Sequence, residues 1–342
     1  MVVTRTDDLG DEVEALAARH GGRVGLTPVL TDLDRRLRRS WAPGLAVRRA
    51  WAWDRHDQAD RGWWPQGISV ATGGRYLAVS WYATAGGSRV SFVDLRRRRY
   101  GHVLLVLPTS EGHEPLRVHA GGLAWTDRHL YVAATGKGLW VCRLDDVVRT
   151  DGGYVLPARH RLSPSEDFRF SFVSPDAGSR LLAGEYGGAR QTHRLLSFSA
   201  DGGPAELAEH GVVRAQGIVR TGDGLHLTAS HGPWGLGSLW SGPAGSLRER
   251  RFALPMGVED LAYDASRDRL WTVTEHPWRR WLVTARLSLH SPIVGVASVT
   301  RRVRWQGVRR EGIPGVFRAA ATQPACPDGG AQQARIGERR LS

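Results

Sequence analysis

Short alternating apolar runs recur along this chain at a nearly constant interval. The clearest copy spans residues 118–144, where polar turn residues at 127–128 and 136–138 separate three such runs. Alternation with a period of two residues, interrupted by short polar turns, predicts antiparallel strands joined by tight connections. Equivalent positions in successive copies lie 55, 49, 46 and 43 residues apart and are Gly67, Gly122, Ser171, Gly217 and Asp260.

This interval limits the fold class. Four-stranded blades of a β-propeller repeat about every 40–50 residues, whereas helical solenoids need a helical apolar period that is absent from these copies. The 14 tryptophans and 42 glycines also suit an all-β body with many turns. We therefore predict an all-β fold, a five-bladed β-propeller with a short N-terminal helical segment.

The chain outside the repeats is expected to form a collar and a tail. Val13, Leu16 and Ala17 have helical spacing within residues 8–20, and a second helix is expected over residues 31–39, with Thr31 as its cap. The C-terminal residues are small, polar and proline-containing, as in disordered segments. The expected divisions are a helical collar at 1–44, the propeller at 45–317 and a disordered tail at 318–342.

Ring closure needs one further strand, because an open sheet edge leaves backbone groups unpaired. Two segments could supply it, residues 45–53 from the N-terminal side or residues 299–305 from the C-terminal side. The sequence alone does not choose between them.

Composition limits the cellular compartment and the binding partners that we expect for this protein. No apolar run of about 18 residues and no secretory signal is present, so we expect a cytoplasmic protein without a membrane partner. Cys142 lies in a predicted strand and Cys326 in the proline- and glycine-rich tail, so we do not expect them to form a disulfide framework. The net charge of +13 comes from scattered arginines, with Lys137 as the only lysine, and no nucleic-acid motif accompanies them. We expect a solvated arginine surface and no nucleic-acid partner.

Three stretches carry a family resemblance. Residues 64–69 (WPQGIS), 119–125 (HAGGLAW) and 130–133 (LYVA) resemble an uncharacterised actinobacterial propeller family, and the likeness extends over about residues 45–290. The resemblance implies the propeller fold and supplies no catalytic motif. Many members of that family carry an export signal, which this chain lacks.

Propeller geometry predicts where a site would form. The innermost strand of each blade starts, and the second strand ends, on the same face of the ring, because consecutive strands are antiparallel. Several side chains expected there are ionisable, which favours a functional funnel over a purely structural ring. The inner-strand starts are Gln66, His119, Arg169, Gln216 and Glu259, and the second-strand ends are Trp81, Thr135, Glu185, Tyr186, His231, Glu275 and His276.

Carboxylates and imidazoles that face a partly enclosed cavity can act as general acids and bases. We expect His119 to be the base and Glu259 or Glu185 the acid, with His231 and His276 orienting the ligand. Each of these residues also has a plainer interpretation, such as a backbone hydrogen bond or a turn. The expected catalytic residues are His119, Glu185, His231, Glu259, Glu275 and His276. The expected ligand-binding residues are Trp64, Gln66, Trp81, Tyr186, Gln216 and Trp234.

These residues predict an enzyme of specialised metabolism that transforms a small organic molecule, aromatic or anionic, without a cofactor. A lyase, cyclase or hydrolase would use such chemistry, although no Gly-x-Ser-x-Gly nucleophile elbow is present. One alternative is a non-catalytic propeller, lectin-like or binding a protein, through a rim formed by Trp63, Trp64 and Trp81. The other is an enzyme that holds a divalent metal on His119, His231 and His276.

Overall fold

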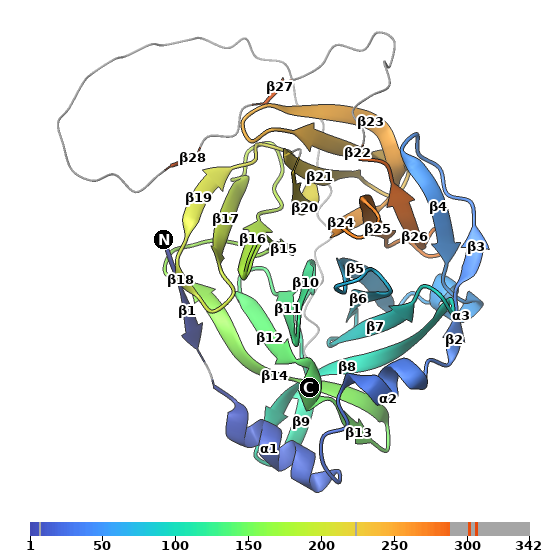
Figure 1. The fold of residues 1–342 in the computed structure, drawn as a ribbon, viewed down its shortest axis with the longest axis vertical. Helices are drawn as coiled ribbons and strands as arrows, with labels where there is room; N and C mark the ends of the chain where they lie inside the picture. The colour runs from blue at the N-terminus through green and yellow to red at the C-terminus, as the bar shows by residue number, and fades with distance from the viewer. Residues whose placement is uncertain (7, 223, 288–299, 302–304, 307–342) are drawn as a thin grey trace, which may run out of the picture. The chain divides into compact units, whose positions relative to one another are not determined.

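Four-stranded antiparallel units recur through the computed structural model, which describes residues 1–6, 8–222, 224–287, 300–301 and 305–306 (Figure 1). In each unit the strands pair in meander order, and we number the units blades 1 to 5. Blade 1 comprises β5 (Trp63–Val70), β6 (Tyr76–Ala83), β7 (Ser88–Asp94) and β8 (Arg99–Thr109). Blade 2 comprises β10 (Leu123–Thr126), β11 (His129–Ala133), β12 (Leu139–Arg143) and β14 (Gly153–Pro164).

The remaining blades follow the same order. Blade 3 comprises β15 (Phe172–Asp176), β16 (Arg180–Gly184), β17 (Arg194–Ser199) and β19 (Glu206–Glu209). Blade 4 comprises β20 (Ala215–Thr221), β21 (Gly224–His231), β22 (Gly235–Gly242) and β23 (Leu247–Met256). Blade 5 comprises β24 (Val258–Asp264), β25 (Arg269–Thr274), β26 (Trp281–Ala285) and β4 (Val47–Ala52). The prediction of an all-β propeller is confirmed.

Blade 5 obtains its outer strand from the N-terminal side of the chain. Strand β4 pairs antiparallel with β26, with Ala50 opposite Val283, and β3 (Arg38–Ser40) extends the sheet beyond β4. The other possible closing segment contributes β27 (Thr300–Arg301) to blade 4 and β28 (Trp305–Gln306) to blade 3. The structure thus selects the N-terminal strand for closure.

Inner strands approach one another backbone to backbone at the aligned repeat positions. A Cβ on Gly122 would lie 2.3 Å from the amide nitrogen of Val173, and one on Gly217 would lie 2.3 Å from the amide nitrogen of Leu261. Any side chain there would force the blades apart, which explains glycine at these two repeat positions. The fifth aligned position, Asp260, instead directs its carboxylate toward the neighbouring inner strands.

The segment before the blades is only partly helical. Helix α1 (Gly10–Arg19) confirms the first predicted helix and buries Val13 and Leu16. The second prediction is wrong, because α2 spans Leu26–Thr31, so Thr31 ends that helix instead of capping a following one. Residues 35–36 and 38–40 are strands β2 and β3, since pairing with β8 and β4 overrides the local helical pattern.

Further short elements connect these parts. Strand β1 (Val2–Thr6) pairs with β14, so residues 1–44 contribute strands as well as helices. No helix among the described residues is long and apolar enough to span a membrane. The expected tail at 318–342 and Cys326 lie outside the described residues. The other elements are α3 (Arg55–Ala59), β9 (Gly112–Pro115), a 3-10 helix at Leu144–Asp146, β13 (Val148–Thr150) and β18 (Gly203–Pro204).

Candidate functional site

Three side chains of the predicted site lie in β-bulges at the starts of inner strands. Register shifts occur between Pro65 and Ile68 in β5, between Ala215 and Gly217 in β20, and between Val258 and Leu261 in β24. A bulge places an extra residue opposite its partner strand and redirects a side chain. The residues within these bulges include Gln66, Gln216 and Glu259.

Two glutamates form the centre of the site. The carboxyl groups of Glu259, in β24, and Glu275, directly after β25, are hydrogen-bonded to each other. The amide Nε2 of Gln216 lies 3.2 Å from Oε1 of Glu259. On the other side, Nε2 of Gln66 donates to Oε2 of Glu275 at 3.0 Å. The four groups form a row that runs from blade 4 through blade 5 to blade 1. It consists of the Gln216 amide, the carboxyls of Glu259 and Glu275, and the Gln66 amide.

Both carboxyl groups hold protons more tightly than ordinary glutamates. Burial, reinforced by the charge of Glu275, raises the pKa of Glu259 well above its usual value. Burial also raises the pKa of Glu275, although its hydrogen bond from Gln66 and the positive charge of Arg280 act in the opposite direction. A hydrogen bond between two carboxyl groups needs one proton, and the larger increase in pKa assigns it to Glu259 and the negative charge to Glu275.

An aromatic pair faces these carboxyls. The rings of Tyr82 and His119 lie 4.5 Å apart between centroids, tilted by 31°. Burial and the charges of Glu275 and Glu259 raise the pKa of the Tyr82 phenol, which keeps it a hydrogen-bond donor. His119 is exposed, yet partial desolvation lowers its pKa, so its imidazole is neutral near pH 7.

His276 and Trp64 border Glu275. The Nε2 atom of His276 lies 3.5 Å from Oε1 of Glu275. The His276 ring packs edge to face on Trp64 at 5.8 Å, and burial lowers its pKa. Trp64, in β5, and His276, directly after Glu275, therefore lie beside the acidic pair.

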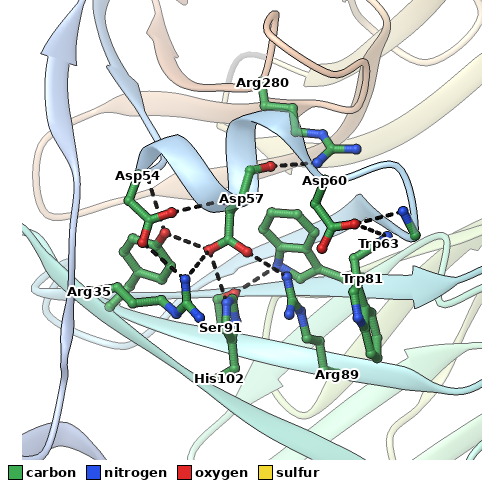
Figure 2. A network of polar contacts seen from close by, with 12 residues as sticks. Arg35, Asp54, Asp57, Asp60, Trp63, Trp81, Arg89, Ser91, His102 and Arg280 are labelled. Atoms are coloured by element: carbon green, nitrogen blue, oxygen red, sulfur yellow. Dashed lines mark hydrogen bonds and ion pairs between the residues drawn. The ribbon is translucent and has the colours of Figure 1, made fainter.

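Arg280 fixes the segment that carries Glu275. Its side chain is fully buried. The Nε atom donates to the backbone oxygen of Glu275 at 2.7 Å. The Nη1 atom donates to the backbone oxygen of Asp57 at 2.5 Å (Figure 2). The amide of Gln58 hydrogen-bonds both the N–H and the C=O of Arg280. Helix α3, which contains Asp57 and Gln58, thereby braces the loop between β25 and β26.

The Asp57 carboxylate lies in a second polar network (Figure 2). It accepts hydrogen bonds from Tyr100 Oη at 2.6 Å, Arg89 Nη2 at 2.9 Å and His102 Nε2 at 3.1 Å. Burial would raise the pKa of Asp57, but the hydrogen bond and charge of His102, together with Arg89, outweigh burial and hold this pKa well below its usual range. The network is a buried, charge-compensated clamp between α3 and blade 1.

Asp57, His102 and Ser91 are connected like a nucleophile triad without being one. Ser91 Oγ lies 2.9 Å from Nδ1 of His102, but Ser91 is fully buried and accepts a hydrogen bond from Trp81 Nε1 at 2.7 Å. No substrate carbonyl can reach that hydroxyl. Trp81 itself is fully buried, so the expected ligand-binding role and exposed rim position of Trp81 are replaced by core packing.

Two predicted catalytic residues lie in other environments. Glu185 forms a two-point ion pair with Arg194, at 2.8 Å and 2.9 Å. Burial opposes ionisation of Glu185, but Arg194 and neighbouring donors lower its pKa to about 2, so it is no proton donor near neutral pH. His231 contacts Ser238 in a separate cavity. Neither residue hydrogen-bonds Glu259 or Glu275.

Two predicted ligand-binding residues are surface side chains. Tyr186 is 40% exposed and Trp234 is 80% exposed. The guanidinium of Arg279 covers the Trp234 ring at 4.0 Å. Neither aromatic residue contacts the glutamate pair through a described interaction.

The metal alternative does not fit the residues that the structure brings together. Within the described ranges, one group of three potential ligands is close enough to share an ion, namely His56, Asp57 and Asp60. Asp57 already faces Arg89 and Arg35, whose charges oppose cation binding. The axial set of His119, His231 and His276 does not assemble there, so we derive no metal chemistry.

Sequence patterns did not indicate Tyr82 or Arg280 as site residues. Tyr82 follows Trp81 in β6, and adjacent residues of a strand point to opposite faces. The prediction took Trp81, whose side chain faces the core, whereas Tyr82 faces the glutamate pair. Arg280 lies in a loop that has no repeat pattern. The inner strands hold a third omitted residue, Asp260, whose Oδ2 accepts from the backbone N–H of Ile68 at 3.0 Å and of Leu123 at 3.1 Å.

Comparisons with known proteins identify no family. No protein-family model and no curated protein matches the sequence. Similar solved structures include a gluconolactonase from Xanthomonas campestris, with 12% identity, a TM-score of 0.41 and coverage of 74% of this chain and 99% of that one. A glutaminyl cyclase from Myxococcus xanthus has 13% identity, a TM-score of 0.41 and coverage of 73% and 96%. A chain of a nidogen–laminin complex has 9% identity, a TM-score of 0.42 and coverage of 70% and 86%. Likeness at this level carries no argument about activity, and the propeller assignment rests on the strand pairing.

Proposed function

We propose that this chain is an enzyme that transforms a small organic molecule by acid–base chemistry at Glu259 and Glu275. The observation that supports this most is the contact between the buried carboxyl of Glu259 and the partly buried carboxyl of Glu275, flanked by the amides of Gln66 and Gln216. A protein gains little stability from such a pair, because burial penalises its charge. Perturbed carboxyls of this kind concentrate at functional sites.

The pair can add one proton and remove another in the same reaction. Glu259, protonated at neutral pH, would donate to a developing oxygen anion or a leaving group, while the Glu275 carboxylate would accept a proton from the substrate. Neutral His119 is the alternative base on the facing wall. The contact between the two carboxyls lets the proton return to Glu259 after each turnover.

This proton balance suits an elimination, a cyclisation or a hydrolysis, and it needs no redox partner. We propose a lyase, cyclase or hydrolase of specialised metabolism that acts in the cytoplasm as a relative of the actinobacterial propeller family. Its substrate is a small organic molecule, aromatic or anionic. The non-catalytic alternative receives less support, because burial of Trp81 interrupts the tryptophan rim on which that alternative depended.

A turnover screen tests the proposal. The protein is incubated with a metabolite library, and consumption is followed by mass spectrometry for the unsubstituted chain, Glu259→Gln and Glu275→Gln. We expect each substitution to reduce the rate at least about 100-fold, the usual contribution of a general acid or base. Glu209→Gln, an exposed residue of β19, is the matched control and should retain full activity.

Two results would contradict the proposal. One is a substrate whose turnover falls no more than about twofold in both Glu259→Gln and His119→Ala. The other is a ligand that binds at the funnel tightly and is recovered unchanged from every incubation with the unsubstituted chain.

A further inference from the structure

A cavity of about 420 Å³ lies against blade 4 and the loop that precedes β17. None of its lining residues belongs to the glutamate pair or its amides. Its walls combine apolar side chains with three ionisable ones. The lining residues are Gly188, Ala189, Val213, Arg214, Ala229, His231, Trp240 and Glu249.

A hydroxyl relay orients His231 within this cavity. Ser238 Oγ donates to Oε1 of Glu249 at 2.7 Å, and Nε2 of His231 lies 2.8 Å from the same oxygen. Because the single hydroxyl hydrogen is directed to Glu249, Ser238 accepts from His231, so Nε2 carries the hydrogen. The Nδ1 atom of His231 is therefore a free acceptor when the ring is neutral and a donor once the ring is protonated. Ser238 is fully buried, whereas His231 is exposed, so the imidazole is accessible from the cavity.

Arg214 provides a positive charge at the same cavity. Its backbone has a left-handed φ of 58°, fixed by a hydrogen bond from its N–H to Gly187 O at 2.8 Å and by one from Ser230 N–H to its own carbonyl at 3.1 Å. Non-glycine residues adopt this conformation at a cost, and such strain concentrates at functional sites. The Arg214 side chain is exposed, and no hydrogen bond or ion pair to a described residue engages its guanidinium.

We propose that this cavity binds a small carboxylate with an apolar body, with Arg214 and protonated His231 holding the carboxylate and Trp240, Val213 and Ala229 contacting the body. A guanidinium matches a carboxylate in two-point geometry. Glu249 lines the same cavity, and its charge disfavours a dianion such as phosphate. The buried indole of Trp240 provides a flat apolar wall.

Ligand binding and protonation of His231 are coupled at this site. Burial lowers the pKa of His231; the charges of Arg214 and Arg251 lower it further, and Glu249 opposes them. A bound carboxylate would neutralise Arg214 and favour the imidazolium, so binding raises this pKa. By linkage, affinity increases as the pH falls through the pKa of His231 in the complex.

A nuclear magnetic resonance titration tests the proposal on the full chain. The imidazole signals of His231, assigned with His231→Asn, are followed against pH with benzoate, acetate or benzamide. We expect benzoate to shift these signals saturably and to raise the pKa of His231, acetate to bind more weakly, and neutral benzamide to have no effect. Arg214→Gln should weaken benzoate binding at least tenfold, and Ser238→Ala should reduce the pH dependence.

Arg248→Gln is the matched control, because Arg248 is an exposed arginine on β23 beside Glu249. It should bind benzoate like the unsubstituted chain. Unshifted His231 signals at saturating benzoate would overturn the proposal, and so would an equal loss in Arg214→Gln and Arg248→Gln, which would indicate general attraction to an arginine-rich surface. Thermal unfolding of each variant separates lost binding from lost folding. Neither outcome depends on Glu259 or Glu275, so the proposed enzyme activity is tested separately.

Discussion

Asp57 and Glu259 are both buried carboxyl groups, with 0% and 3% exposure, yet their surroundings are opposite. Asp57 faces Arg89, Arg35 and His102, and its pKa is held well below its usual range, against the effect of burial. Glu259 faces the amide of Gln216 and a second carboxyl, and its pKa is raised by burial.

The difference separates a stabilising carboxylate from a reactive one. Burying a charge is tolerable when cations and hydrogen bonds compensate for the lost hydration, as around Asp57. Glu185 belongs to the same class through Arg194. A buried carboxyl without such compensation keeps a proton that it can exchange, as we propose for Glu259.

The largest expected effect is on the compensated network. Asp57→Asn removes the negative charge and leaves Arg89 and Arg35 without their shared partner, so the free energy of unfolding should fall by about 3–5 kcal/mol. Denaturant unfolding measures this loss. Asp34→Asn, at an exposed position, should stay within about 0.5 kcal/mol. A loss below about 1 kcal/mol for Asp57→Asn would show that the network is not the clamp we describe.

Arg280 links the two regions and should affect both. Arg280→Met leaves the backbone oxygens of Asp57 and Glu275 without their donor, with an expected loss of about 2–3 kcal/mol in unfolding free energy. It also removes a charge that lowers the pKa of Glu275, so the acidic limb of the pH–rate profile should move to higher pH. Arg279→Met is the control and should leave the profile in place. If the pH–rate profile of Arg280→Met were the same as that of the unsubstituted chain, Arg280 would contribute to packing only and not to the pKa of Glu275.

The pH dependence of stability should have opposite signs for the two carboxyls. The pKa of Glu259 is higher in the folded state, so its contribution is present below the ordinary value of about 4.3 and is lost as the pH rises through the folded value. The pKa of Asp57 is lower when folded, so its contribution is present above about 3.9 and is lost as the pH falls. The free energy of unfolding is measured against pH for each protein. In Glu259→Gln the decrease in stability at rising pH should disappear, and in Asp57→Asn the decrease in stability at falling pH should disappear. The same curve in all three proteins would contradict the assignment.

The smallest expected effect is on the stability of Glu259→Gln at neutral pH. A neutral amide replaces a carboxyl that already holds a proton, so the free energy of unfolding should change by no more than about 1 kcal/mol, and a gain is expected. Denaturant unfolding of Glu259→Gln and Asp57→Asn side by side measures the contrast. A loss similar to that of Asp57→Asn would place Glu259 among the stabilising carboxylates.

Sequence patterns predicted the repeating parts of the molecule better than the joining parts. Gln66, Gln216 and Glu259 could be aligned because they occupy the same repeat position, at the start of the inner strand, and Glu275 and His276 follow from the antiparallel strand order. Helix α3, which contains Asp57, lies in the connection between β4 and β5. This connection has no counterpart in the other blades, so it could not be predicted by aligning the repeats. Their contacts with Arg280 depend on three-dimensional packing that periodicity does not encode.

Local patterns also failed where two faces or two conformations compete. Trp81 and Tyr82 are adjacent in a strand, and the larger apolar ring takes the buried face. Glu185 looks like Glu275 in its repeat position, but Arg194 on the neighbouring strand neutralises it. Residues 31–39 have helical spacing, yet sheet edges at β8 and β4 recruit them as strands.

Strand β4 closes the ring as the outer strand of blade 5, the blade that carries Glu259 and Glu275. The pairing of Ala50 with Val283 joins segments far apart in the chain, and such contacts have a high entropic cost and form late in folding. Helix α3 follows β4 directly, and Gln66 of blade 1 hydrogen-bonds Glu275 of blade 5 across the junction between the first and last blades. The glutamate pair and its two amides are thus assembled only once the ring has closed, so a chain whose ring stays open would keep most of its blades and lack the proposed activity.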